Sequence, residues 1–261
     1  MIGASAGEPP RREAIRAEDV VKVFGKVTAL AGVSLNVARG ETLGILGDNG
    51  AGKSTLIKIL TGYHQPDSGQ VFVDGRPARL GSVDEARALG IECVYQDLAL
   101  VNGLSIYHNM FLNRELLWGG PLKLLDHSAM RRRAAEALAE IGVDVPSVEL
   151  EVGMLSGGQR QAIAVARAVY SQARILLLDE PLAAMGAREA RLIIGLIERL
   201  KARGDIAIVM IAHNYAQTLE ICDRVMLMQH GAVTFESQTA ATSAEELLEI
   251  VRREYRAVRA G

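Results

Sequence analysis

The chain contains two glycine-rich turns, and each leads into a run of residues suited to a helix. The first turn is GDNGAGKST, residues 47–55, and the second is LSGGQ, residues 155–159, which continues into small apolar residues. A helix N-terminus attracts anions, because unpaired backbone N–H groups and the positive end of the helix dipole both point outward there. Each turn is therefore a candidate cradle for a phosphate group.

The first cradle fits the pattern G-x-x-x-x-G-K-[ST]. Its glycines let the backbone curl so that several N–H groups converge on a β-phosphate, while the Lys53 ammonium faces the β- and γ-phosphates and the Ser54 hydroxyl is offered to Mg²⁺. The turn follows an apolar run, ETLGILG, and precedes the helix-like STLIKILTG, a context that a merely flexible loop does not explain. The predicted nucleotide contacts are Gly47, Asp48, Asn49, Gly50, Ala51, Gly52, Lys53, Ser54 and Thr55.

Two acidic residues close a later apolar run. RILLLDEP, residues 174–181, ends in Asp179 and Glu180. Asp179 is suited to hold Mg²⁺ directly or through water, and Glu180 to orient and deprotonate the water that attacks the γ-phosphorus. Taken alone, a solvated acidic pair at a strand end explains these residues as well. The phosphate cradle earlier in the chain favours the catalytic interpretation.

The elements that must position these residues follow a simple order. The first part of the chain is rich in short strands, the middle is helical, and the later part alternates strand, helix and strand, as parallel sheets covered by helices do. We therefore predict an α/β fold with a P-loop NTPase core, an N-terminal antiparallel β portion and an α-helical segment inserted at residues 97–168. Residues 1–12 are predicted to be a flexible tail, and residues 13–261 a single ATPase domain.

Three helices are predicted from their apolar periodicity. They cover residues 127–142, 187–204 and 243–258, the last opened by a Ser243/Glu246 capping box. The residues expected on their inward faces are Met130, Ala134, Ala137, Leu138 and Ile141 in the first, Ile193, Ile197 and Leu200 in the second, and Leu247, Val251 and Tyr255 in the third.

Composition places the chain among ordinary globular proteins. It has 261 residues, of which 49% are hydrophobic and 23% charged, and a net charge of −2 that does not call for nucleic acid as a partner. Cys93 and Cys222 form neither a CxxC pair nor a disulfide framework, so we expect two packing residues in a reducing compartment. The longest apolar run, residues 206–212, is too short to span a bilayer, so any membrane role requires another subunit.

The two glycine-rich turns and the acid pair, in this order, resemble the ATP-binding subunits of ABC transporters. The resemblance covers about residues 14–258. In that family two ATPase domains meet head to tail, and each ATP lies between the phosphate loop of one domain and the LSGGQ of the other. The resemblance therefore implies ATP and Mg²⁺ as cofactors and an ATP-dependent homodimer. The residues that would contact the partner's γ-phosphate in trans are Ser156, Gly157, Gly158 and Gln159.

Three further positions match that family's pattern. Phe24 lies where an aromatic ring stacks on adenine, although a Phe in a strand core is the alternative. Gln96 matches the glutamine that touches Mg²⁺ and the attacking water, and His213 the histidine that contacts the γ-phosphate. The remaining histidines fit no site pattern. One segment departs from the family: where Ser-Ala-Leu-Asp is usual, residues 183–186 read Ala-Ala-Met-Gly, without polar side chains for contacts between the two sites.

Three stretches of the chain, at residues 61–75, 86–101 and 109–115, most resemble ATPases of monosaccharide importers of the ribose/fructose type. This resemblance implies a peripheral protein on the cytoplasmic face of the membrane. Its partners would be transmembrane permease subunits and an extracytoplasmic solute-binding protein, with no nucleic acid. The alternatives are the ATPase of another ABC importer or exporter, and a soluble ABC ATPase acting on nucleic acid or ribosomes.

Overall fold

The structure is a computed structural model that describes residues 12–119 and 123–260, with the side chains of residues 255–260 left out. The predicted tail, residues 1–12, falls almost wholly outside the described residues, and so does the side chain of Tyr255. Within the described ranges, no helix is long and apolar enough to cross a membrane.

An antiparallel sheet forms the N-terminal portion, as predicted. Its order is β2-β1-β4-β5, and a tight turn at Gly25 joins its two long strands. The strands are β1 (Glu13–Phe24), β2 (Val27–Ala38), β4 (Ser68–Val73) and β5 (Arg76–Ala78).

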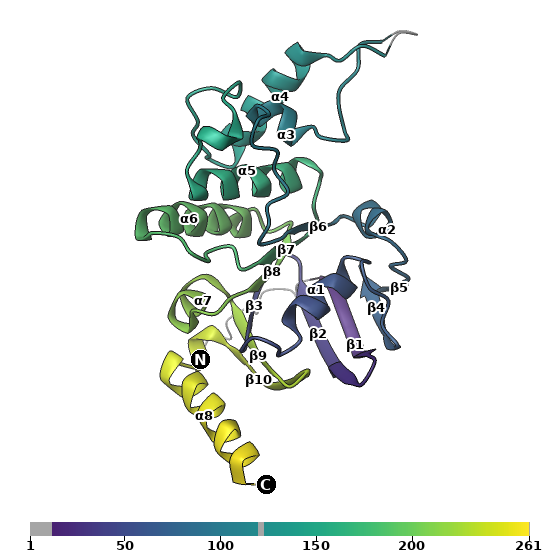
Figure 1. Ribbon diagram of the computed structural model, residues 1–261, viewed down its shortest axis with the longest axis vertical. Coiled ribbons are helices and arrows are strands. Elements are labelled where there is room, and N and C mark those ends of the chain that lie inside the picture. The colour runs from purple at the N-terminus through teal and green to yellow at the C-terminus, as the bar shows by residue number, and fades with distance from the viewer. Residues whose placement is uncertain (1–11, 120–122, 261) are drawn as a thin grey trace, which may run out of the picture.

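A larger, mainly parallel sheet forms the centre of the molecule, in the order β10-β9-β3-β8-β7-β6 (Figure 1). Only β10 runs antiparallel to its neighbour. All residues of β3 and β8 are buried, as short continuous apolar runs predict for strands covered on both faces. The strands are β3 (Thr42–Leu46), β6 (Ile91–Val94), β7 (Ile175–Asp179), β8 (Ala207–Ile211), β9 (Arg224–Gln229) and β10 (Ala232–Gln238).

Helices α3, α4 and α5 form a lobe at one end of the molecule, and α6 lies between this lobe and the large sheet (Figure 1). The α-helices are α1 (Lys53–Leu60), α2 (Val83–Ala88), α3 (Ile106–Met110), α4 (His127–Glu140), α5 (Gly157–Tyr170), α6 (Ala187–Arg203), α7 (Tyr215–Ile221) and α8 (Ala244–Ala260). Two short 3₁₀ helices are η1 (Val152–Met154) and η2 (Thr239–Ala241).

The predicted inward faces are largely buried. In α4 and α6 every predicted residue is buried except Ala137, which is partly buried. In α8, Leu247 is buried and Val251 partly so. The Ser243 hydroxyl accepts a hydrogen bond from the Glu246 N–H at 3.1 Å, but the Glu246 carboxylate accepts one from the Thr242 hydroxyl at 2.9 Å.

Alternate residues of the central strands face two different cores. Leu176 and Leu178 of β7 pack with the helical lobe and α6, whereas Leu177 packs with the antiparallel sheet and α1. Burial on both sides is the main stabilising contribution to such a sheet. It also holds the carboxyl ends of the parallel strands in fixed positions.

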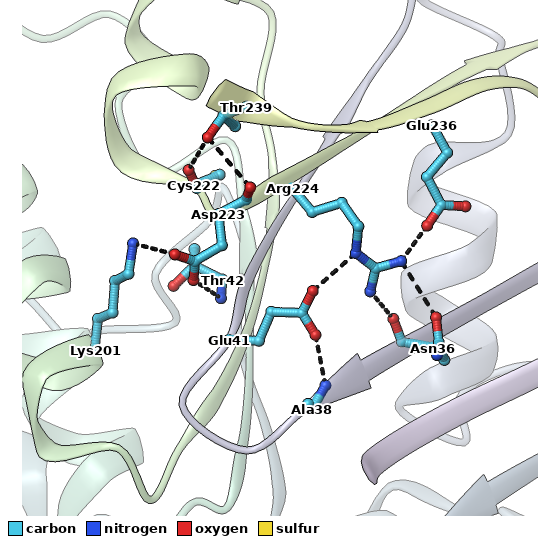
Figure 2. Close-up of polar contacts among 10 residues, drawn as sticks. All are labelled: Asn36, Ala38, Glu41, Thr42, Lys201, Cys222, Asp223, Arg224, Glu236 and Thr239. Carbon is cyan, nitrogen blue, oxygen red and sulfur yellow. Dashed lines mark hydrogen bonds and ion pairs between the residues drawn. The ribbon is translucent and has the colours of Figure 1, made fainter. Parts of the chain in front are cut away.

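A polar network links several strands at the opposite edge of the sheet, at the amino ends of β3 and β9 (Figure 2). Arg224, whose side chain is only 13% exposed, donates from Nε to the Glu41 carboxylate at 2.8 Å and also contacts Asn36 and Glu236. The Glu41 carboxylate in turn accepts the Ala38 N–H at 2.7 Å. Strands β2, β3, β9 and β10 are thus tied together by one guanidinium group.

Replacing Arg224 with Ala is expected to lower the free energy of unfolding by about 2–4 kcal/mol, because the largely buried Glu41 carboxylate loses its cation. Urea denaturation measures the change. Arg253→Ala is the matched control, since the Arg253–Glu249 pair on α8 is exposed and should contribute little. Equal stability of the two variants would contradict a structural role for the network.

Candidate nucleotide site

The phosphate loop connects β3 to α1 and is closed in by neighbouring backbone. A Cβ on Gly47, which has a φ of +146°, would come 2.2 Å from the carbonyl oxygen of Met228. A Cβ on Gly52, at φ +100°, would come 2.5 Å from the carbonyl oxygen of Ala29. Only glycine satisfies both the backbone conformation and the close approach at these positions. The tip of the loop and the Ser54 side chain remain exposed at the N-terminus of α1.

The Lys53 side chain lies inside the curl of this loop. It is 5% exposed, and its Nζ donates to the carbonyl oxygens of Gly47 at 2.6 Å and Asp48 at 2.9 Å. Burial lowers the pKa of Lys53, and the negative charges of Glu180, Asp48 and Asp179 oppose that shift. The loop therefore holds a cation that faces the acid pair.

The strand register brings the remaining predicted residues to the same edge. Val94 of β6 pairs with Leu178, Asp179 pairs with Ile211, and Ile211 pairs with Ile45 of β3. Gln96, the acid pair, His213 and the phosphate loop each follow directly from these carboxyl ends. In open α/β sheets, ligands bind in the crevice outside the carboxyl ends of the strands.

Asp179 and Glu180 occupy different environments. Burial raises the pKa of Asp179, as does the charge of Glu180, while Lys53, Lys58 and His213 lower it. The Glu180 backbone has a φ of +53°, which turns the chain at the strand end, and its N–H donates to the Ile211 carbonyl at 3.1 Å. Its carboxylate lies 2.5 Å from His213 Nε2. The acid next to the strand end is thus paired with an imidazole, a contact that the sequence pattern did not predict.

Phe24 lies at the end of β1, outside the hydrophobic clusters of the described residues, and is 43% exposed. Its ring meets the ring of His64 edge-on, with 5.2 Å between centroids, and Lys22 Nζ lies 5.5 Å from its centroid. The alternative that Phe24 is a core residue is therefore wrong. The contact with His64 depends on how the chain turns after α1, which residue spacing does not reveal.

The second cradle begins α5 in the helical lobe. The Ser156 hydroxyl accepts the Gln159 N–H at 3.3 Å, and the Gln159 side-chain oxygen accepts the Ser156 N–H at 3.0 Å. This reciprocal capping box is indicated by the S-x-x-Q spacing, although we did not predict it. The two cradles thus begin helices in different parts of the molecule (Figure 1).

The segment after Glu180, residues 183–186, makes no polar side-chain contact, as its sequence of Ala, Ala, Met and Gly requires. Ala183, Ala184 and Gly186 are exposed, and Gly186 begins α6 without a side-chain hydrogen bond of its own. A cavity of about 290 Å³ separates this segment from the start of α7, with His213 and Met185 among its lining residues. Any polar side-chain contact between the two ATP sites must therefore be made by residues outside 183–186.

A phosphate loop, an acid pair at a neighbouring strand end and a helical lobe with its own glycine-headed helix define an ATPase of the ATP-binding cassette class. Residues 30–183 match the ABC transporter family, and the chain belongs to it. ATP binding and ATP hydrolysis are the activities of this class.

Among relatives, the chain is 44% identical to the xylose/arabinose import ATP-binding protein of Sulfolobus acidocaldarius, covering 89% of this chain and 91% of that protein. It is 41% identical to the fructose import ATP-binding protein of Rhizobium meliloti, covering 83% and 85%. It is 39% identical to a ribose import ATP-binding protein of Burkholderia thailandensis, covering 89% of this chain but 45% of that protein.

Solved structures agree with this assignment. An ATP-binding cassette of an ABC transporter in its ADP conformation superposes with a TM-score of 0.78 at 27% identity, covering 90% of this chain and 92% of that one. A dimeric cassette in a post-hydrolysis state, bound to ADP and Pi, gives a TM-score of 0.72 at 26% identity, covering 86% and 98%.

Proposed function

We propose that this chain is the ATP-hydrolysing subunit of a transporter that imports a monosaccharide. The observation that supports the proposal best is its similarity, over nearly their full length, to xylose/arabinose and fructose import ATP-binding proteins. The names of those proteins assign them to the import of simple sugars. A ribose import ATP-binding protein contains a segment that is similar to this chain. The solute itself would be selected by other subunits.

We assign the chemistry of hydrolysis to the edge where the strands end. Ser54, Asp179 and Gln96 offer hydroxyl, carboxylate and amide oxygens, the ligand types that Mg²⁺ takes, and the partly buried Asp179 beside Glu180 gains from a divalent cation. That cation would neutralise charge on the phosphates. Glu180 accepts the proton of the attacking water, and His213 holds the Glu180 carboxylate in place. Lys53 and the loop N–H groups hold the β- and γ-phosphates.

From the second cradle we infer that the protein forms an ATP-dependent homodimer. Ser156 and the N–H groups of Gly157 and Gly158 serve the γ-phosphate of a second copy, since the phosphate loop of the same chain joins β3 to α1, outside the helical lobe (Figure 1). ATP then joins two copies, and hydrolysis releases them, because the contacts differ between the two nucleotide states.

The permease would bind where the helical lobe meets the sheet. A groove of about 810 Å³ lies there, lined among others by Arg87, Glu92, Met110, Arg114 and Arg167. Glu92 pairs with Arg114 at 2.9 Å, so the lining combines a charged pair with the apolar side chain of Met110. A short amphipathic helix from a membrane subunit suits this lining. Such a partner would hold the chain at the cytoplasmic face of the membrane, with a solute-binding protein on the other side.

The test is to recover the tagged chain with its membrane partners and reconstitute the complex in vesicles with its solute-binding protein. ATP hydrolysis is then measured with xylose, arabinose, ribose or fructose on the binding-protein side, and with an amino acid as the control solute. We expect one monosaccharide to stimulate hydrolysis. Stimulation by the amino acid alone, or recovery with nucleic acid or ribosomes instead of a permease, would overturn the proposal.

Replacing Phe24 with Ala is expected to weaken ATP binding by about 1–3 kcal/mol, because the adenine loses its stacking surface. Turnover at saturating ATP should remain nearly unchanged, since the phosphate contacts are intact. Titration with a fluorescent ATP analogue measures the affinity. Phe24→Tyr retains an aromatic face and should bind almost normally, and a loss of affinity equal to that of the Ala variant would argue against stacking.

A further inference from the structure

Glu189 stands on the first turn of α6, but its carboxylate lies at the N-terminus of α5. The Gly158 N–H donates to Glu189 Oε1 at 3.3 Å. A Cβ built on Gly157 would lie 3.7 Å and 3.9 Å from the two carboxylate oxygens, and one on Gly158 would lie 2.9 Å from Glu189 Cβ. The side chain therefore runs along both glycines of LSGGQ, and both of its oxygens face them.

The surroundings of this carboxylate favour its charged form. The pKa of Glu189 is lowered mainly by the Gly158 N–H, then by the Ser156 hydroxyl and by the N–H groups of Gly186 and Gly157. Within the part of the chain that the structure describes, no ion pair with Lys, Arg or His accompanies these hydrogen bonds. Glu189 is thus an anion held between two helix N-termini, a position that the helix dipole stabilises.

We propose that Glu189 is the internal anion of the second cradle, which the γ-phosphate of the partner's ATP must displace when two copies associate. This inference rests on the proposed function, because it uses the same donors: Ser156, Gly157 and Gly158. An N–H group carries one proton and cannot bond fully to two anions, and a carboxylate beside a phosphate repels it. The carboxylate therefore makes dimer formation demand a γ-phosphate.

The same residue links the second cradle to the start of α6, since the N–H groups of Gly158 and Gly186 both act on its carboxylate. Glu189 follows Glu180 by nine residues, and α6 begins at Ala187, after the segment that contains Glu180. A carboxylate released from α5 frees the start of α6 from the second cradle. Glu189 is therefore a polar link between α5 and α6 within one chain, formed next to a segment in which Ala183 and Gly186 offer no polar side chain.

The test uses Glu189→Gln in a chain that also carries Glu180→Gln, so that hydrolysis does not deplete ATP. The amide keeps the size of the side chain and an oxygen for Gly158, but it removes the charge. The ATP concentration at half-maximal dimer formation, followed by light scattering, is expected to fall at least about fivefold. Glu198→Gln on the exposed face of the same helix is the matched control and should leave this midpoint unchanged.

Glu189→Ala is a second variant, which removes both the charge and the contact. It should lower the midpoint as well, and thermal unfolding monitors whether the fold is retained. An unchanged or raised midpoint in both Glu189 variants would overturn the inference and leave Glu189 as a structural support of the LSGGQ turn. If the Glu180→Gln chain does not dimerise with ATP at all, the proposed function fails instead.

Discussion

Replacement of Glu180 by Gln is expected to give a protein that binds ATP, fails to hydrolyse it and remains dimeric while ATP is present. An amide does not accept the proton of water at neutral pH, so hydrolysis should fall by about 10²–10⁴-fold. Lys53, Ser54 and Asp179 are unchanged, so nucleotide affinity should persist. Phosphate release measures the first effect, and a monomer-to-dimer shift on size exclusion with ATP, but not with ADP, measures the second.

Ser156→Arg, added to the same chain, is the control for this result. The larger side chain blocks the approach of a second copy to the LSGGQ turn, while the phosphate loop still binds ATP. We expect the shift to disappear and ATP to remain bound to the monomer. Persistence of the ATP-dependent dimer would mean that the second cradle is not shared between chains.

Lys53→Ala is expected to reduce ATP affinity by at least about 100-fold, because the β- and γ-phosphates lose a buried counter-charge that is held in place by two loop carbonyls. Equilibrium binding of ATP measures the loss. Lys58→Ala, later in the same helix, is the control: Lys58 is exposed and lies over the ring of Tyr63, 5.8 Å from its centroid. Normal ATP affinity in the Lys53 variant would contradict the assignment of residues 47–55 as the phosphate-binding loop.

Short-range patterns account for the part of the fold that the sequence predicted. The strand-rich N-terminal portion, the buried run before the phosphate loop and the helices at residues 127–140 and 187–203 lie where strand-forming residues, apolar runs and 3.6-residue periodicity indicate, although the two N-terminal strands are longer than the short strands predicted. The phosphate loop could also be predicted from local sequence, because its glycines are required by the backbone conformation of the loop itself. These features need no knowledge of distant contacts.

Features that depend on distant contacts were not predicted. Strand β3 pairs with β8 and β9, and neither partner is evident from residue order. The His213–Glu180 pair arises because β7 and β8 are adjacent, and Glu189 reaches LSGGQ because α5 and α6 pack together. Neither the His213–Glu180 contact nor the Glu189–LSGGQ contact is indicated by the local pattern of residue types. The proposed roles of the site residues remain predictions that the variants above test.

The pairing of β3 has a consequence for how the protein is made. The strand that carries the phosphate loop is synthesised well before both of its neighbours, β8 and β9, which come from residues 207–229. Until residues 207–229 have been made, the nascent chain displays an apolar strand, TLGIL, without the partners that it has in the folded protein. Contacts so far apart in sequence close slowly, and unpaired strand edges promote aggregation during that interval. The nucleotide site can form only after residues 207–229 have been synthesised, so chains truncated before residue 207 should be insoluble and should not bind ATP.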